Sequence, residues 1–338
     1  MIRDSIEMLV QGRSLSRQEA AQSMAEIMDG EATPAQFGAF VTALRLKGET
    51  SEEITGMAQI MREKSLHVSV DGPMIDTCGT GGDGSGTFNI STTAGLVVAG
   101  SGVKVAKHGN RAMSGACGSA DVLEALGVNI MLGSEGVKQC IDEIGFGFMF
   151  AQTFHPAMKY ASAPRREIGI RTVFNILGPL TNPAGAISQV IGVANPAVGE
   201  KIAKVLGQLG SYHSFVVHGL DGLDEVSLID NTHIWELKEG TVSSYDLEPY
   251  DFGLDHSETV IPKIGSAEES ARAVRKVLQG HVGPERYIVL VNAAVALMAA
   301  DQVSSLQEGV QVALESIDSG SAMSKLTSLV DFSQKLEY

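Results

Sequence analysis

The first 65 residues carry apolar side chains at the three- and four-residue spacing of amphipathic helices. Helix starts are marked by capping boxes that begin at Ser16 and Thr50, and by Thr33 directly before Pro34. The apolar positions that share this spacing are Met24, Ile27, Met28, Phe37, Phe40, Val41, Leu44, Ile54, Met57, Ile60 and Met61. The pattern predicts about four short helices that form a small helical unit.

From residue 67 onward, short apolar runs alternate with helical segments. Strands are expected at 66–70, 74–77, 103–106, 146–150, 190–193, 214–217 and 259–261, and helices at 119–126, 134–144 and through the C-terminal third. This alternation predicts an α/β fold with a central, largely parallel sheet flanked by helices. We expect residues 1–66 to form an N-terminal helical domain, joined by helices from about 160–190, and residues 67–338 to form the α/β domain.

The chain of 338 residues has 25 Lys and Arg against 40 Asp and Glu, a net charge of −15. Such an acidic protein repels phosphate backbones and anionic lipid, which disfavours general nucleic-acid binding and membrane anchoring. The three cysteines, Cys78, Cys117 and Cys140, are too scattered for a disulfide framework, and the N-terminus lacks the apolar segment of a signal peptide. We therefore expect a cytoplasmic protein.

A glycine-rich segment at residues 76–92 follows a predicted strand and precedes a predicted helix, and eleven of the 38 glycines lie between Cys78 and Ser119. Glycines let backbone N–H groups approach an anion, and Asn89, Ser91 and Thr92 stand near the helix start, where phosphate is favoured. The segment has neither a Walker A lysine nor the acid of a dinucleotide-binding motif. It predicts a phosphate site of another kind, with a turn used only for packing as the alternative.

Two further segments carry charges that suit a phosphorylated ligand. Lys107, His108 and Arg111 follow a predicted strand and form a local cationic cluster, for which a solvated basic loop is the alternative. Asp224 and Glu225 follow an apolar run, and such paired carboxylates bind Mg²⁺ together with substrate phosphates. From these residues alone, an exposed acidic loop remains the alternative to a metal site.

Three arginines, Arg165, Arg166 and Arg171, lie within seven residues. A guanidinium binds a carboxylate through two hydrogen bonds, so one of them suits a carboxylate ligand, while structural ion pairs are the alternative for the others. The cysteines and histidines lack metal-ligand spacing, and no G-x-S-x-G elbow is present. The sequence therefore gives no support to a zinc enzyme or a hydrolase with a nucleophile elbow.

Taken together, these motifs resemble those of the anthranilate phosphoribosyltransferase family, in the same order and spacing over essentially the whole chain. The motifs that carry the resemblance are Gly79–Asp83, Asn89–Thr92, Lys107–Arg111 and Asn175–Pro183, with the Asp224–Ser227 loop in addition. The resemblance implies a small helical domain plus a larger α/β domain, assembled as a homodimer through the helical parts. It also implies a glycosyltransferase activity, EC 2.4.2.18, in tryptophan biosynthesis.

In that reaction anthranilate displaces pyrophosphate from 5-phosphoribosyl 1-diphosphate with Mg²⁺ present. The resemblance implies Lys107 and Asp83 as catalytic residues. It implies a phosphoribosyl diphosphate site formed by Gly79, Gly82, Asp83, Thr87, Asn89, Ser91, Thr92, Lys107 and Ser119. It implies anthranilate contacts at Gly79, His108, Asn110, Arg165 and Pro179, and Mg²⁺ ligands at Ser91, Asp224 and Glu225.

Two other functions stay open at this point. A pyrimidine-nucleoside phosphorylase has a related fold that handles ribose and phosphate, but the intact Lys107–Arg111 and Asp224–Ser227 segments count against it. A non-catalytic relative that binds nucleic acid needs a broad basic groove, which the net charge of −15 disfavours. The expected partners are therefore the two small-molecule substrates and a second copy of the chain, with neither nucleic acid nor a membrane.

Overall fold

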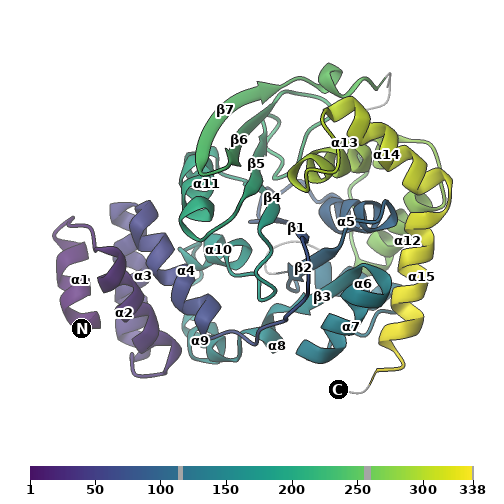
Figure 1. The fold of residues 1–338 in the computed structure, drawn as a ribbon. Helices are drawn as coiled ribbons and strands as arrows, with labels where there is room; N and C mark the ends of the chain where they lie inside the picture. Colours follow the sequence, from purple (N-terminus) through teal and green to yellow (C-terminus); the bar gives the residue numbers. More distant parts are fainter. Residues whose placement is uncertain (113–116, 255–259, 337–338) are drawn as a thin grey trace.

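The computed structural model describes residues 1–112, 117–254 and 260–336, and its first part is helical. The four N-terminal helices are α1 (Ile2–Val10), α2 (Arg17–Met28), α3 (Pro34–Lys47) and α4 (Ser51–Glu63). Both predicted capping boxes are present, since the side chains of Ser16 and Thr50 accept the backbone N–H groups of Glu19 and Glu53. Helix α9 (Lys159–Ile168) packs against α2 and α3, and Figure 1 shows it beside this helical part.

The rest of the chain is built around one seven-stranded sheet in the order β3-β2-β1-β4-β5-β6-β7. The strands are β1 (Ile75–Gly79), β2 (Val105–Gly109), β3 (Phe146–Phe150), β4 (Ser188–Gly192), β5 (His213–Gly219), β6 (Thr232–Lys238) and β7 (Thr241–Leu247). The first five in chain order run parallel, whereas β6 and β7 are antiparallel additions at one edge. The predicted fold class, a helical part plus an α/β part with a largely parallel sheet, is confirmed.

Helices cover both faces of the sheet (Figure 1). They are α5 (Ile90–Gly100), α6 (Ser119–Leu126), α7 (Ser134–Ile144), α8 (Ala151–Phe154), α10 (Phe174–Leu177), α11 (Gly199–Gln208), α12 (Ala267–Leu278), α13 (Pro284–Ala299), α14 (Leu306–Asp318) and α15 (Ser321–Ser333). Short 3-10 turns lie at Pro156–Met158, Gly178–Leu180, Pro196–Val198 and Pro249–Phe252. None of the helices within the described ranges has the length and apolarity to cross a membrane.

Alternate residues of the central strands enter two different cores, as the two-residue period of a strand requires. On one face, Val190 and Phe215 join the core that α5 and the C-terminal helices cover. On the other face, Ile191 and Val216 pack in the same core as α11 and the N-terminal helices. The helical part is therefore continuous with one side of the sheet, and their junction lies next to β4 and β5.

Two elements differ from the sequence-based expectations, apart from the strand expected at 259–261, of which residue 259 lies outside the described residues and residues 260 and 261 belong to no strand. Residues 66–70 were expected as a strand but form an irregular connection, in which the N–H groups of Leu66 and Val68 donate to Phe154 and Pro183 carbonyls instead of to a strand. The hairpin of β6 and β7 was not expected, because β7 is an exposed edge strand with little apolar periodicity. Neither difference changes the fold class.

Candidate active site

The glycine-rich segment begins at the carboxyl ends of the parallel strands, which is where open α/β sheets bind ligands. Strands β1, β2 and β4 end at Gly79, Gly109 and Gly192. Gly79 is paired with Gly192 across the sheet, and the N–H of Thr80 donates to the Gly192 carbonyl at 2.8 Å. The segment therefore leaves β1 directly above the centre of the sheet.

Asp224 fits against these strand ends only because they are glycines. A Cβ on Gly192 would lie 1.6 Å from the Asp224 carbonyl oxygen, and a Cβ on Gly79 would lie 2.6 Å from its Oδ2. The same Oδ2 accepts the N–H of Gly81 at 2.7 Å, where a φ of +64° favours glycine. The loop after β5 is thus closed onto the loop after β1.

Three carboxylates gather at this point, those of Asp83, Asp224 and Glu225. Burial raises the pKa of Asp224 to about 6, and the neighbouring charge of Asp83 acts in the same direction. Burial and Asp224 likewise raise the pKa of Glu225, whose Oε1 accepts the N–H of Ser91 in the first turn of α5 at 3.1 Å. The local excess of negative charge favours a bound cation.

The chemistry of this donor set fits Mg²⁺. Among the described residues, no group of three or more His, Cys, Asp and Glu side chains has the arrangement of a complete metal site. Mg²⁺ does not need one, because it takes one or two carboxylates and completes its octahedron with water and substrate phosphate oxygens. Asp224 and Glu225, with the hydroxyl of Ser91 close by, are the residues that would hold it.

Lys107 lies beneath the glycine-rich segment and is only 1% exposed. Its Nζ donates to the Thr77 carbonyl and lies 3.5 Å from the hydroxyl of Ser91. Burial lowers the pKa of Lys107, while the carboxylate of Asp76 acts in the opposite direction. An ammonium has three donors, and these two contacts use two of them.

Two of the predicted phosphate contacts lie at the start of α5, where Asn89 is half-buried and Thr92 is buried. Asn89 precedes α5, but its Oδ1 accepts hydrogen bonds from Ser270 at 2.7 Å and Cys117 at 3.1 Å. Thr92 is fully buried, and its hydroxyl has no hydrogen-bond partner among the described residues. Sequence reasoning missed Ser270, because it comes from α12, 181 positions after Asn89.

The remaining predicted phosphate contacts lie around the loop after β1 and the end of β2. Asp83 Oδ1 accepts the N–H of Ser85, whose hydroxyl lies 3.3 Å from that of Thr87. The hydroxyl of Ser119, at the start of α6, donates to the Asn110 carbonyl at 3.4 Å. These side chains are partly exposed, apart from Asn110, which is exposed.

Gly82 is exposed and lies close to the side chain of Arg171, a contact that the sequence did not indicate. A Cβ there would lie 1.8 Å from Nη1 of Arg171, and Nη2 of Arg171 donates to the Thr80 carbonyl at 3.3 Å. The sequence suggested a carboxylate ligand or a structural ion pair for Arg171, whereas its guanidinium covers the tip of the glycine-rich loop.

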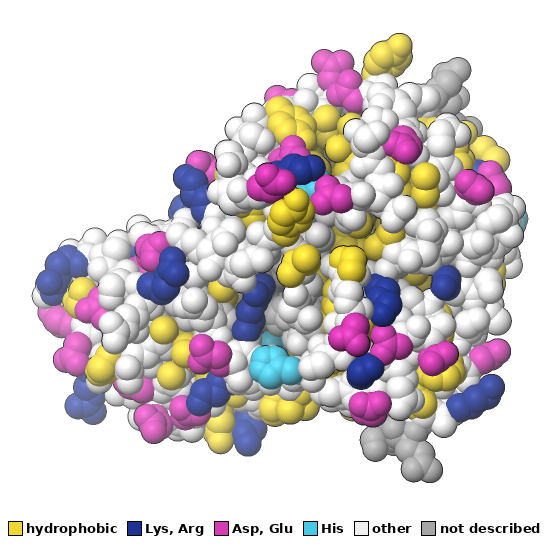
Figure 2. All heavy atoms as spheres, in the orientation of Figure 1, with side chains coloured by type: hydrophobic (Ala, Val, Ile, Leu, Met, Phe, Trp, Pro, Cys, Tyr) yellow, Lys and Arg dark blue, Asp and Glu magenta, His cyan; other side chains and the backbone are white. Residues whose placement is uncertain are grey.

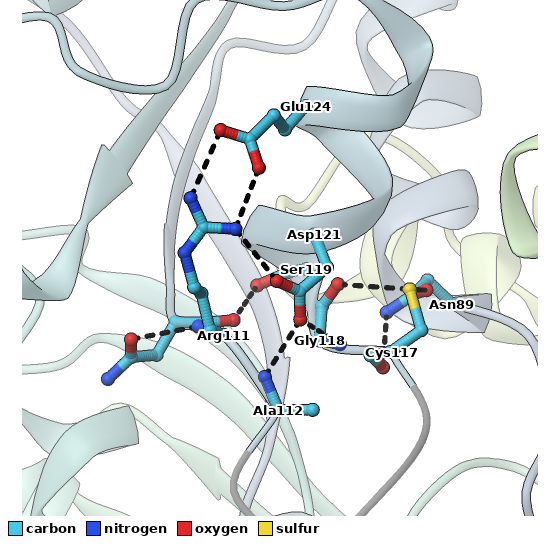
Figure 3. A network of polar contacts seen from close by, with 9 residues as sticks. Asn89, Arg111, Ala112, Cys117, Gly118, Ser119, Asp121 and Glu124 are labelled. Atoms are coloured by element: carbon cyan, nitrogen blue, oxygen red, sulfur yellow. Dashed lines mark hydrogen bonds and ion pairs between the residues drawn. The ribbon is translucent and has the colours of Figure 1, made fainter. Parts of the chain in front are cut away.

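The segment of Lys107, His108 and Arg111, predicted as a cationic cluster, is not the solvated basic loop that was its alternative, because Lys107 and His108 are buried. His108 is buried, and burial lowers its pKa to about 3, which leaves the ring neutral. Arg111 is bound by the carboxylates of Asp121 and Glu124, at 2.9 and 2.7 Å. Figure 3 shows this network, in which Asp121 also accepts the N–H groups of Ala112 and Gly118. Arg111 therefore anchors the loop after β2 to α6.

A second group of predicted contacts lies next to β2. Nδ1 of His108 lies 3.2 Å from the Gly178 carbonyl, and a carbonyl can only accept, so Nδ1 carries the proton and Nε2 is an acceptor. That Nε2 has no partner within the described ranges. Pro179 follows and is buried, so it can line only the deepest part of a site. Asn110, one residue beyond β2, is exposed.

Arg165 comes from α9, and its guanidinium carbon lies 5.2 Å from the ring centre of Phe174, four residues before Gly178. Burial lowers its pKa. On the face shown in Figure 2, a basic side chain lies at the hollow between the helical part and the α/β part. A planar acceptor with a carboxylate suits such surroundings, because a guanidinium can bind the carboxylate through two hydrogen bonds.

Asp76, a buried carboxylate that the sequence did not point to, connects the residues around Lys107 with those around His108. Asp76 on β1 is fully buried and accepts the His108 N–H at 3.3 Å and Nδ2 of Asn182 at 2.8 Å. Burial raises the pKa of Asp76 to about 6, although Lys107 acts against this. Its position in a buried strand gave no sequence signal, since the partners are 32 and 106 positions away.

Comparison with known proteins gives consistent matches over the whole chain. The glycosyl transferase family helical bundle domain matches residues 3–65, and the glycosyl transferase family a/b domain matches residues 71–323. The anthranilate phosphoribosyltransferase of Dehalococcoides mccartyi is 54% identical over 338 residues, which covers 99% of each chain. That of Moorella thermoacetica is 53% identical over 331 residues, which covers 98% of each.

Two solved structures extend the similarity to the fold. The anthranilate phosphoribosyltransferase of Thermus thermophilus superposes with a TM-score of 0.92 at 43% identity, covering 98% of this chain and 99% of that chain. The Saccharomyces cerevisiae enzyme in complex with PRPP and Mg has a TM-score of 0.91 at 30% identity, covering 99% and 98%.

Proposed function

Because the chain belongs to the anthranilate phosphoribosyltransferase family of glycosyl transferases, we propose that it transfers the phosphoribosyl group of 5-phosphoribosyl 1-diphosphate to the amine of anthranilate. This transfer is a step of tryptophan biosynthesis. One observation carries the residue assignment. The carboxyl ends of the parallel strands bring together three features. They are the glycine-rich loop, the carboxylates of Asp224 and Glu225, and the buried His108–Gly178 contact.

The reaction breaks the bond between ribose C1 and the diphosphate oxygen and forms a bond from C1 to the amine nitrogen, which loses one proton. Negative charge grows on the departing diphosphate. Lys107 and the N–H groups of the loop after β1 are fixed donors at the base of the site, and donors of this kind stabilise developing charge without reorganisation. To these donors we assign stabilisation of the leaving group. Asp83 is the second proposed catalytic residue.

Mg²⁺ belongs to the proposal because the donor set described above suits it, and the yeast relative has been solved with PRPP and Mg. When bound, the ion neutralises diphosphate charge. Asp224 and Glu225 would hold it, with Ser91 as the third ligand, and Gly79 and Gly192 keep Asp224 in place. Gly82, Thr87, Asn89, Thr92 and Ser119 complete the proposed phosphoribosyl diphosphate site, in which Thr92 is buried and Asn89 is half-buried.

The acceptor side is assigned to His108, Asn110, Arg165 and Pro179, with Gly79 next to them. Nε2 of His108 is a neutral acceptor and would take a hydrogen bond from the amine N–H. An aromatic amine is already neutral at pH 7, so no strong general base is required and positioning supplies much of the rate. The yeast relative has also been solved in complex with 4-fluoroanthranilate, which supports an aromatic acceptor here.

Three further statements are part of the proposal. A homodimer that forms through the helical part is supported by the family resemblance, and a cytoplasmic location is supported by the three scattered cysteines. A domain boundary near residue 66 is supported by the two family models, which end and begin at residues 65 and 71.

The test is anthranilate fluorescence with the protein, 5-phosphoribosyl 1-diphosphate and Mg²⁺. Loss of signal that needs all three supports the assignment. A flat trace with folded protein contradicts it and directs attention to nucleoside phosphorolysis. Arg165→Ala is expected to raise the KM for anthranilate at least tenfold, since an Arg–carboxylate pair contributes about 1.5–3 kcal/mol. Arg166→Ala, which removes the exposed neighbouring arginine, is the control.

A further inference from the structure

Four consecutive carbonyl oxygens, those of residues 178–181, each accept a hydrogen bond from the side chain of a different element. The pairs are Gly178 with His108 Nδ1 at 3.2 Å, Pro179 with Gln189 Nε2 at 3.0 Å, Leu180 with Arg62 Nε at 2.7 Å and Thr181 with His155 Nε2 at 3.1 Å. We call residues 178–181 the acceptor wall, because Pro179 and the His108 contact place them beside the proposed anthranilate site.

The four donors come from parts of the chain that are far apart. His108 belongs to β2 and Gln189 to β4, whereas Arg62 belongs to α4 in the helical part and His155 follows α8. A turn that only reverses the chain satisfies its carbonyls with its own N–H groups or with water. Here the turn makes its own bonds at the Gly178 carbonyl, from the N–H and the hydroxyl of Thr181 at 3.2 and 3.1 Å. Side chains from four directions add to them and fix both the place and the rotation of the wall.

Three of these donors keep a buried polar atom without a partner among the described residues: His108, whose Nε2 is already assigned to the amine, and two that the proposed function leaves unassigned. Within the described residues, Nη2 of Arg62 and Oε1 of Gln189 make no hydrogen bond. Burying such atoms destabilises the fold, and an apolar side chain of similar shape would avoid this. A requirement for stability alone therefore does not explain them, whereas a requirement to hold two particular carbonyls does.

We propose that Arg62 and Gln189 are positioning residues for the acceptor site, which hold the acceptor wall at the distance from the ribose that the aromatic amine requires. The inference rests on the proposed function. Neither side chain is part of the proposed phosphoribosyl diphosphate or Mg²⁺ site. Arg62 also donates to the Leu209 carbonyl at the end of α11, at 3.3 Å, so it sets the wall relative to the helical part and to α11 together.

Loss of Arg62 or Gln189 should weaken the binding of anthranilate and not that of 5-phosphoribosyl 1-diphosphate. Loss of either donor lets one carbonyl of the wall turn, which shifts Pro179 and the His108 ring against the acceptor. The glycine-rich loop and the carboxylates are attached to other elements and keep their geometry. Misplacement of a reacting group by about 1 Å can reduce the rate about a hundredfold, so kcat with anthranilate should fall as well.

The experiment compares Arg62→Gln, Arg62→Lys and Gln189→Met with wild type, measuring kcat, the KM for each substrate and Tm. Arg62→Gln and Gln189→Met are expected to raise the KM for anthranilate about tenfold and to leave that for 5-phosphoribosyl 1-diphosphate within about twofold. Arg62→Lys keeps one donor and is expected to restore part of the affinity.

Gln208→Met is the matched control. Gln208 joins α11 to α4 through Glu52 at 2.7 Å and Thr55 at 2.5 Å, and neither contact involves the acceptor wall. It should lower Tm without changing either KM more than about twofold. The proposal is overturned if both KM values rise together in Gln189→Met, or if neither changes. Should Arg62→Gln not fold, Gln189→Met and Arg62→Lys decide the outcome. Inactive wild type would refute the proposed function itself.

Discussion

His155 makes stability depend on pH in a way that can be calculated from its surroundings. It is 5% exposed, and burial lowers its pKa from 6.5 to about 4, although hydrogen bonds to the Thr181 and Met61 backbone act in the opposite direction. The folded state therefore keeps the ring neutral at a pH at which the unfolded chain protonates it. Its stabilising contribution is present above pH 6.5 and is lost as the pH falls toward 4.

The magnitude follows from proton binding to the unfolded chain. With a pKa of 6.5 unfolded and about 4 folded, lowering the pH from 6.5 to 5.0 favours unfolding by about 1.6 kcal/mol through this one group. His155→Gln keeps a donor for the Thr181 carbonyl and removes the titration. The difference in unfolding free energy between wild type and His155→Gln should therefore change by about 1.6 kcal/mol over this range.

The assay is urea unfolding of both proteins at pH 6.5 and 5.0. Comparing the two proteins matters, because burial raises the pKa values of Asp76 and Asp224 to about 6. These carboxyls stabilise the fold as the pH falls and would mask the histidine in a measurement on wild type alone. His67→Gln, at an exposed position, controls for the loss of a histidine. A wild-type to His155→Gln difference that is the same at both pH values would refute the reasoning.

Three other substitutions test the site. Gly192→Ala places a Cβ 1.6 Å from the Asp224 carbonyl, so a denaturation curve should show a loss of more than about 2 kcal/mol, together with loss of activity; unchanged stability would contradict the close approach. Gly82→Ala meets Arg171 at 1.8 Å and a φ of +79°, and should raise the KM for 5-phosphoribosyl 1-diphosphate about tenfold with the anthranilate KM unaffected. Asp224→Asn should increase the Mg²⁺ concentration for half-maximal rate at least tenfold; an unaltered Mg²⁺ titration would remove Asp224 from the ligands.

Much of the fold could be predicted because its signals are local. Capping boxes at Ser16 and Thr50 marked helix starts correctly, and Gly127 ends α6 in the left-handed conformation. The glycine-rich segment was recognised as a strand-to-helix connection from its neighbours alone. The β6–β7 hairpin lacked such a signal, since its pairing depends on the edge of β5 and not on its own pattern.

The sequence predicted which types of residue form the site, but not which of them are buried or what they bind. Sequence spacing cannot show that Lys107 and His108 point into the fold while Arg111 is bound by Asp121 and Glu124. Nor does it reveal a partner such as Ser270 or Asn182, which is separated from the residue it binds by more than a hundred positions. Burial and long-range pairing decide these states, and both arise only from the packed structure.

The shared core of the helical part has a consequence for how the protein is made. Phe40, Leu44 and Met57 lie in one cluster with Phe174, Ile202 and Val216. A ribosome releases the first three long before the last three, and at about 5–20 residues per second the delay is about 8–32 seconds for 160 residues. During that interval the early helices lack the surface that covers them. The nascent chain therefore presents an incomplete apolar face to chaperones until most of the sheet has been synthesised.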